Sequence, residues 1–233
     1  MANSELFSFF IKITALTLLY SCSSSSTTEK AEKDKPIIYK EVEPSQTYES
    51  CKIGGQTWMA QNLNEPHFKN GDPITEAKSA EEWKKAGNIG KPAWCYYNND
   101  PKLGEKFGKL YNWYAVNDPR GLAPKGWSVA TNKNWEELLA ELKKQDKDAM
   151  ALQHASFIGN YPDADALQFH AYGSGFRKES GGFKGIDTYA SFWTADTANA
   201  YSAYAFHLKK DQFNPLLGAS YKTFAFSVRC IKN

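Results

Sequence analysis

The chain has 233 residues, a formal net charge of +2 and an aromatic share of 15%, with seven tryptophans. Lysines and acidic residues are interspersed without a basic stripe, so the charge pattern does not indicate a nucleic-acid-binding protein. The aromatic content and the many glycine, asparagine and aspartate turns are typical of an exported domain with short strands and ordered loops.

The N-terminal segment has the layout of an export signal. Lys12 precedes an apolar run over residues 13–19, and Leu19-Tyr20-Ser21-Cys22 resembles a lipobox with a small residue before the cysteine. The run is too short for a comfortable membrane span. We predict that residues 1–21 are a lipoprotein signal peptide and that Cys22 is lipidated, with Ser23 favouring the outer membrane of a bacterial cell envelope. An ordinary secretory signal or a short anchoring helix is the alternative.

Residues 22–46 form the next compositional unit. They carry serines and threonines followed by mixed charges, with almost no apolar side chains. Such a segment cannot bury enough surface to offset the entropy of ordering, which predicts a flexible tether. Residues 47–233 are numerous enough for one domain with a substantial core.

The first strongly patterned segments of this domain are a hairpin and a capped helix. Gly54-Gly55 interrupts two short strand-like runs within residues 50–59, and such a pair suits a two-residue turn. Ser79 and Glu82 have the spacing of a capping box and Gly87 marks a stop, which predicts a short helix over residues 79–87.

Aromatic residues mark the middle of the chain. Residues 94–97 predict an extended run that enters a turn over residues 98–101. Leu110, Trp113 and Tyr114 have helical spacing, which predicts a helix within residues 108–116.

The clearest amphipathic pattern follows a strand that runs through Val129. Thr131 suits an N-cap, and the apolar residues from Trp135 to Leu142 repeat at helical spacing. Alternation over residues 224–231 predicts a closing strand. Four tryptophans fall within strand and helix patterns and are predicted to be mainly core: Trp58, Trp113, Trp127 and Trp135.

The residue types that carry catalysis or bind metals are not arranged in recognisable motifs. The histidines at positions 67, 154, 170 and 207 lack a Glu-x-x-His frame and an adjacent second histidine, so each is interpreted as a surface or packed residue. Asp163 and Asp165 are interpreted as parts of a solvated loop, and no nucleophile elbow or phosphate loop occurs. We therefore predict no catalytic set, no metal site and no cofactor.

The cysteine count fits an exported protein. Apart from Cys22, the chain has Cys51, Cys95 and Cys230, an odd number that predicts one disulfide and one free thiol in an oxidising compartment. No two of these cysteines are separated by two to four residues and no histidine lies near them, so the spacing does not predict a zinc cluster.

Several unusual blocks follow one another along the chain. They include Ile53-Gly54-Gly55-Gln56-Thr57-Trp58-Met59, Gly108-Lys109-Leu110-Tyr111-Asn112-Trp113-Tyr114, Ala123-Pro124-Lys125-Gly126-Trp127, Gly175-Phe176-Arg177 and Ser227-Val228-Arg229-Cys230. In this order they resemble the Fibrobacter succinogenes major paralogous domain over residues 48–233.

The resemblance implies an α+β fold of the C-type-lectin-like and formylglycine-generating-enzyme group. Such a fold has small antiparallel sheets, flanking helices, long structured loops, and N- and C-terminal strands brought together. The family often has cysteine at the positions of Cys95 and Cys230, which implies a disulfide between these two and an unpaired Cys51. The rival pairing is Cys51 with Cys230, if the first and last strands lie side by side.

The same resemblance implies a tethered, non-catalytic module that binds a glycan or a protein ligand through its loops. The candidate contact residues are Asn98, Asn99, Asp100, Tyr172, Arg177 and Tyr189. The competing structural interpretation is that residues 98–100 only build a turn and that Arg177 only pairs with a buried carboxylate. Two other functions stay open: a structural or envelope-assembly lipoprotein, and an uncharacterised enzyme related to the formylglycine-generating fold.

Overall fold

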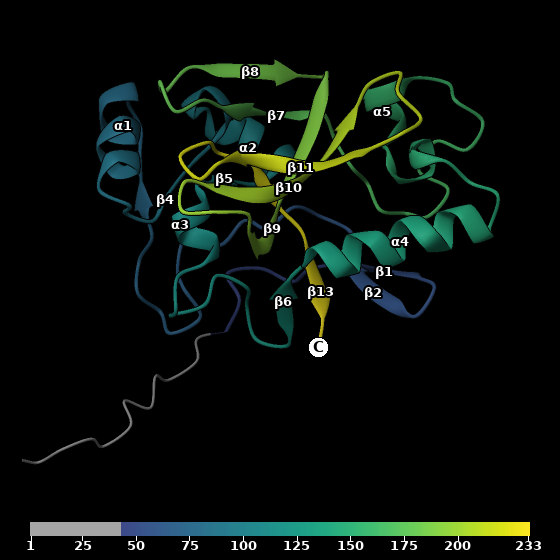
Figure 1. The fold of residues 1–233 in the computed structure, drawn as a ribbon, viewed down its shortest axis with the longest axis horizontal. Coiled ribbons are helices and arrows are strands. Elements are labelled where there is room, and N and C mark those ends of the chain that lie inside the picture. Colours follow the sequence, from purple (N-terminus) through teal and green to yellow (C-terminus); the bar gives the residue numbers. More distant parts are fainter. Residues whose placement is uncertain (1–42) are drawn as a thin grey trace, which may run out of the picture. The chain divides into compact units, whose positions relative to one another are not determined.

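The computed structural model describes residues 43–233 (Figure 1). The expected signal peptide, Cys22 and most of the expected tether lie outside the described residues. Ser45, near the end of the expected tether, donates its backbone N–H to the carboxylate of Glu65 at 3.0 Å, so contacts with the domain begin before residue 47. Within the described part, no helix combines the length and the apolar character needed to span a bilayer.

The helices begin where the sequence offers capping groups. The Ser79 hydroxyl accepts from the backbone N–H of Glu82 at 3.1 Å, and the Glu82 carboxylate accepts in return from the N–H of Ser79. Thr131 caps the longest helix in the same reciprocal way, with Asn134 in place of a glutamate. The α-helices of the described residues are α1 (Ala80–Asn88), α2 (Pro101–Phe107), α3 (Trp113–Val116), α4 (Asn132–Lys144) and α5 (Ala155–Ile158).

The helix expected within residues 108–116 is wrong in its first half. Leu110 lies in a short strand, where it pairs with Cys95, and the helix begins only after Asn112. The Asn112 side-chain oxygen accepts from the N–H of Ala115 at 3.1 Å and from the N–H of Ala93 at 3.0 Å. One amide thus caps α3 and ties it to the neighbouring strand, a tertiary constraint that helical spacing alone does not reveal.

The strands within residues 43–233 form four small sheets, so the class is α+β. The first sheet has the order β1 (Ser50–Ile53), β2 (Gln56–Met59), β13 (Cys230–Lys232), β6 (Trp127–Val129). The second has the order β11 (Leu216–Tyr221), β10 (Ser202–Lys209), β9 (Tyr189–Thr197), β12 (Ser227–Val228). The third is β3 (Thr75–Glu76), β4 (Ala93–Cys95), β5 (Leu110–Tyr111), and the fourth is β7 (Ser174–Arg177) with β8 (Phe183–Ile186). Most pairs are antiparallel as expected, but β3 with β4 and β9 with β12 are parallel.

The C-terminal segment joins two of these sheets. The single closing strand expected over residues 224–231 is divided into β12, which pairs with β9, and β13, which lies between β2 and β6. Between them stands Arg229, whose side chain is fully buried. The expected pairing of N- and C-terminal strands is present, since β13 pairs with β2.

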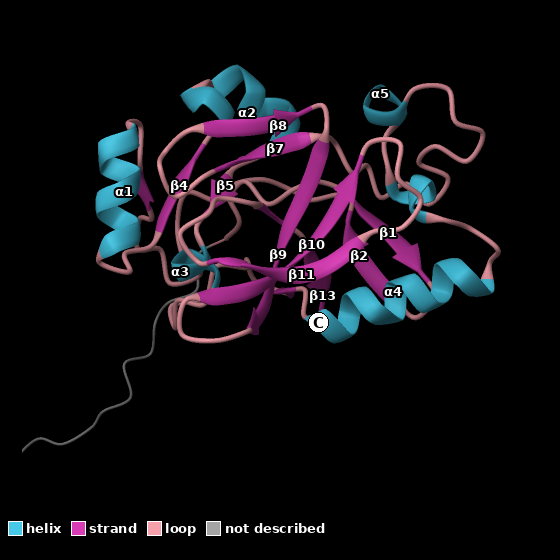
Figure 2. Ribbon diagram, turned by 45° about the horizontal axis from the view of Figure 1, so that its top comes forward, coloured by secondary structure: helices cyan, strands magenta, loops and turns pink. Residues whose placement is uncertain are grey.

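One face of the second sheet is closed by α4. The strands β9 and β10 run through the middle of the domain (Figure 2). The Trp135 ring of α4 stacks on Phe206 and Phe192 of these strands, with centroid distances of 4.1 and 5.5 Å. Trp58 packs against Trp135 at 4.7 Å. Trp58, Trp113 and Trp135 are therefore core residues as expected, whereas Trp127 is only partly buried.

The expected Cys95–Cys230 disulfide is absent, because all three described cysteines are free and buried. They pack in three different apolar clusters, which keeps the thiols in separate parts of the core. The rival Cys51–Cys230 bridge is excluded by register. Cys51 pairs with Trp58 and Trp58 with Ile231, so β2 separates the two cysteines, at about twice the 4.8 Å strand spacing, and they point to opposite faces.

Candidate functional site

The face of the second sheet opposite α4 carries a different set of side chains. The antiparallel register pairs Tyr189 with Lys209 and Ser191 with His207. Because side chains alternate between the two faces of a strand, these four point away from the phenylalanines that stack on Trp135. On this second face α3 contacts β9, where Trp113 and Trp193 share one apolar cluster, and none of the four side chains belongs to that cluster.

A cavity of about 640 Å³ opens on this face. Phe176 of β7 lies in the cavity wall, and its ring centroid is 6.0 Å from that of Tyr189 and 6.2 Å from that of Phe224. The Phe176 and Phe224 rings are nearly parallel. The volume of the cavity lies within the range of about 300–1,000 Å³ that is typical of small-molecule sites. Polar side chains complete the lining, from Gln212, Asn214 and Ser220. We call this the aromatic cavity.

His207 and Ser191 form the polar floor of the aromatic cavity. The Nδ1 atom of His207 lies 2.9 Å from the Ser191 hydroxyl oxygen, and the His207 ring meets Phe226 edge-on at 5.3 Å. Burial lowers the pKa of His207 from 6.5 to about 4. The imidazole is therefore neutral at pH 7 and acts as a hydrogen-bonding group rather than as a charge.

The charge of the aromatic cavity is positive. Lys184 and Lys209 line it, and the Lys209 ammonium lies 5.8 Å from the centre of the Tyr189 ring. None of the described residues that line the cavity is an aspartate or a glutamate. The site thus combines aromatic walls, neutral hydrogen-bonding groups and two ammonium groups.

Tyr189 is the one sequence-predicted contact residue that lines the aromatic cavity. Asn98 and Asn99 are exposed and both have left-handed backbone conformations, with φ of 53° and 55°, which is the geometry of a turn. Asp100 caps α2, because its carboxylate accepts from the N–H of Lys102 at 2.9 Å. The observed contacts of residues 98–100 are therefore those of a turn and a helix cap, as the competing structural interpretation expected.

Arg177 cannot contact a ligand in this structure, which corrects the expectation. Only 1% of it is exposed, and its guanidinium donates to the carbonyl oxygens of Gly181 at 2.9 Å and Ala77 at 2.8 Å. The guanidinium also lies over the rings of Trp83 and Phe183 at 5.0 and 4.7 Å. Its partners are carbonyls and rings, not the buried carboxylate considered as the alternative.

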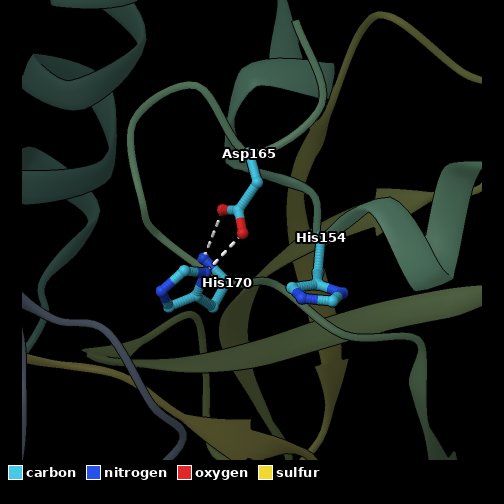
Figure 3. A group of neighbouring side chains, drawn as sticks. All are labelled: His154, Asp165 and His170. Carbon is cyan, nitrogen blue, oxygen red and sulfur yellow. Dashed lines mark hydrogen bonds and ion pairs between the residues drawn. The ribbon is translucent and has the colours of Figure 1, made fainter. Parts of the chain in front are cut away.

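Tyr172 belongs to a second cluster. Its ring packs on His154 at 4.5 Å, and His154 lies near Asp165 and His170 (Figure 3). All three are half-buried, and one ligand-type atom from each lies within 4.8 Å of the others. Asp165 accepts from the backbone N–H of His170 at 2.7 Å and pairs with the same residue's Nδ1. No motif or spacing in the sequence predicts this grouping.

One signal in the sequence could have located the aromatic cavity. In β10, His207 and Lys209 alternate with Phe206 and Leu208, which marks a strand with one polar and one apolar face. For the second cluster no local spacing exists, because a non-regular loop brings the residues of positions 154 to 170 together.

A family comparison places the domain. No curated protein and no solved structure matches the chain. The sequence model of the Fibrobacter succinogenes major domain matches residues 51–232, which includes every strand and helix described above except the first residue of β1. The chain belongs to the Fibrobacter succinogenes major domain family.

Proposed function

We propose that the protein is a non-catalytic binding module whose aromatic cavity holds a glycan. The observation that carries this proposal is the asymmetry of one sheet. The face of β9, β10 and β11 that meets α4 is closed by stacked rings, whereas the opposite face borders an open cavity of about 640 Å³ at Tyr189 and His207. A stable fold does not need such a cavity, and contiguous open apolar surface is typical of binding sites.

The chemistry of the cavity suits a hydroxyl-rich ligand. Aromatic rings such as Tyr189 and Phe176 pack against the apolar faces of sugar rings, while amide, hydroxyl and ammonium groups bond to sugar hydroxyls. Gln212, Asn214 and Lys209 supply those groups at the rim. A C-type-lectin-like fold is part of the proposal, supported by the pairing of the terminal strands β2 and β13.

We further propose that the module is held at a bacterial cell envelope by a lipid on Cys22, with the outer membrane favoured. This rests on the segment Leu19-Tyr20-Ser21-Cys22 and the polar stretch after it. Globomycin should cause a heavier precursor to accumulate, and Cys22→Ser should abolish acyl labelling. A soluble protein whose mature N-terminus lies elsewhere would contradict the anchor and leave the cavity proposal untouched.

An enzyme is the second candidate, because Ser191 and His207 are within hydrogen-bonding distance as a nucleophile and its base would be. Three features oppose it. Only 1% of Ser191 is exposed, the lowered pKa of His207 makes it a weak base at pH 7, and no carboxylate lines the cavity to orient the imidazole. We expect a fluorophosphonate probe to leave Ser191 unlabelled, and stoichiometric labelling would favour the enzyme.

A glycan array read with the full chain tests the binding function. We expect a defined set of glycans to bind, and Tyr189→Ala to lose that binding. Tyr201→Ala is the matched control, because Tyr201 is 79% exposed and lies in the turn between β9 and β10, away from the cavity lining. Equal binding by both variants would remove the aromatic cavity as the site. Binding of envelope proteins but no glycan would favour the assembly function.

A further inference from the structure

We propose that His154, Asp165 and His170 bind one divalent transition-metal ion of the zinc class. Two imidazoles and one carboxylate offer ligand atoms within 4.8 Å of one another, and Figure 3 shows the three side chains converging. Two histidines and an acidic residue are a recurrent set of three protein ligands for zinc, with water in the fourth position. This site is separate from the aromatic cavity, whose lining contains none of the three.

Hydrogen bonds from the core hold the loop that carries Asp165 and His170. Arg229, which is fully buried, donates to the carbonyl oxygen of Phe169 at 2.5 Å and to that of His170 at 2.8 Å. Asp165 and His170 both have left-handed backbone conformations, with φ of 56° and 53°. Such conformations are uncommon for non-glycine residues and persist where surrounding contacts impose them. The ligand positions are therefore set by the core rather than by a mobile loop.

The third ligand is oriented by its own neighbours. His154 is the N-cap of α5, and its Nδ1 lies 2.9 Å from the hydroxyl oxygen of Ser156. Nδ1 also accepts a hydrogen bond from the backbone N–H of Ser156 at 3.1 Å, which places the proton of the neutral ring on Nε2. Coordination through Nε2 therefore requires the ring proton to move to Nδ1, where the Ser156 hydroxyl can accept it in place of the backbone contact. Tyr172 packs on the same ring at 4.5 Å and limits its rotation.

The ligand types select the class of metal. Calcium and magnesium prefer several oxygen ligands, whereas imidazoles suit zinc, cobalt, nickel and copper. Here Asp165 is the single carboxylate of the set, beside two imidazoles. One carboxylate disfavours hard cations, because these need several oxygen ligands. The Asp165 carboxylate and Nδ1 of His170 are in direct contact, so a metal ion held by both residues must take the place of this contact and move the two groups slightly apart.

The test is metal titration of the full chain carrying Cys22→Ser, which removes the cysteine outside the described residues. After removal of metals by a chelator, isothermal titration with zinc chloride should give one ion per chain, and calcium chloride should give none. Cobalt(II) should produce ligand-field absorption bands without a thiolate charge-transfer band. If the ligand-field bands are absent, or if a thiolate charge-transfer band appears, the proposal is overturned. This result needs no variant.

Variants then assign the ligands. His154→Ala and His170→Ala should each weaken zinc binding at least about tenfold, because changes even in the outer shell of a metal site cost that much. His67→Ala is the matched control, since His67 is exposed and not part of the group. Unchanged affinity in both ligand variants overturns the assignment. If a variant does not fold, the cobalt spectrum of the parent chain decides.

Discussion

The two faces of the sheet formed by β9, β10 and β11 share the same strands but are packed differently. On one face, Phe192 and Phe206 stack on Trp135 of α4, and none of the three is exposed. On the other face, Tyr189 and His207 line a cavity of about 640 Å³. Strand alternation supplies both sets of residues, but α4 covers the first face over Phe192 and Phe206, whereas on the second face α3 reaches the region of Trp193 and leaves Tyr189 and His207 to line the cavity. Aromatic content alone therefore does not distinguish a core from a binding site. What distinguishes them is whether another element packs over the face that carries the aromatic residues.

The largest effect is expected where the sheet is closed. Trp135→Ala removes the ring that joins α4 to β9 and β10, and truncation of a buried tryptophan costs about 3–5 kcal/mol. Urea denaturation should show that loss in the free energy of unfolding. Trp135→Phe is the milder comparison, because it keeps a ring and removes an indole N–H that has no hydrogen-bond partner among the described residues. An equal loss in the two variants would contradict the stacking account.

The next effect is the pH dependence that His207 gives the open face. Its folded pKa of about 4 lies below the unfolded value of 6.5, so between these values the unfolded chain binds a proton that the folded chain does not. Stability is complete above about pH 6.5 and is lost as the pH falls towards 4, by roughly 3 kcal/mol in all. Subtracting the profile of His207→Gln isolates this contribution. Identical profiles would show that His207 is not buried as described.

A smaller stability effect is expected at the wall of the aromatic cavity. Tyr189 is only partly buried and contacts Phe176 at its edge, so Tyr189→Ala should lower the free energy of unfolding by about 1 kcal/mol or less. Urea denaturation beside the Trp135 variants measures the contrast between the two faces directly. A loss as large as that of Trp135→Ala would mean that the second face is also core.

The smallest effect is expected for the cysteines, because the described cysteines form no disulfide that would stabilise the apolar clusters. Because Cys51, Cys95 and Cys230 are free, adding dithiothreitol should leave the urea midpoint unchanged. A disulfide would typically contribute about 2–4 kcal/mol, which reduction would remove. Burial raises the pKa of Cys51 to about 11 and of Cys95 to about 12, so both thiols should resist alkylation until the chain unfolds.

Local chemistry made part of the fold predictable. The capping groups Ser79 and Thr131 and the apolar stripe of α4 lie within a few residues of the helices they define, and these elements were predicted. Long-range burial was not predictable in this way. Nothing near Arg177 in the sequence indicates that it donates to the carbonyl of Ala77, a hundred residues earlier. A polar residue in a strand signals a binding residue or a buried structural one equally well.

The candidate sites show the same limit. Tyr189 was predicted as a contact residue, but Phe224, which lines the same cavity, comes from another part of the chain. The three residues His154, Asp165 and His170 lack the spacing of a known motif. The loop that brings them together is held by Arg229, which is distant in the sequence. The strands β9, β10 and β11 pair as consecutive hairpins, but periodicity predicts only the two faces of each strand. It does not predict which face is covered, because the covering helix α4 comes from another part of the chain.

The most direct test uses two neighbouring residues of the edge strand β11. Ser220 lines the aromatic cavity, whereas Ala219 is exposed and, by strand alternation, points to the opposite face. We would measure by isothermal titration the affinity of a glycan selected on the array for Ser220→Trp and Ala219→Trp. Ser220→Trp should fill the cavity and weaken binding at least tenfold, about 1.4 kcal/mol, while Ala219→Trp should bind as the unaltered chain does. Full affinity in Ser220→Trp would contradict the assignment of the aromatic cavity as the binding site.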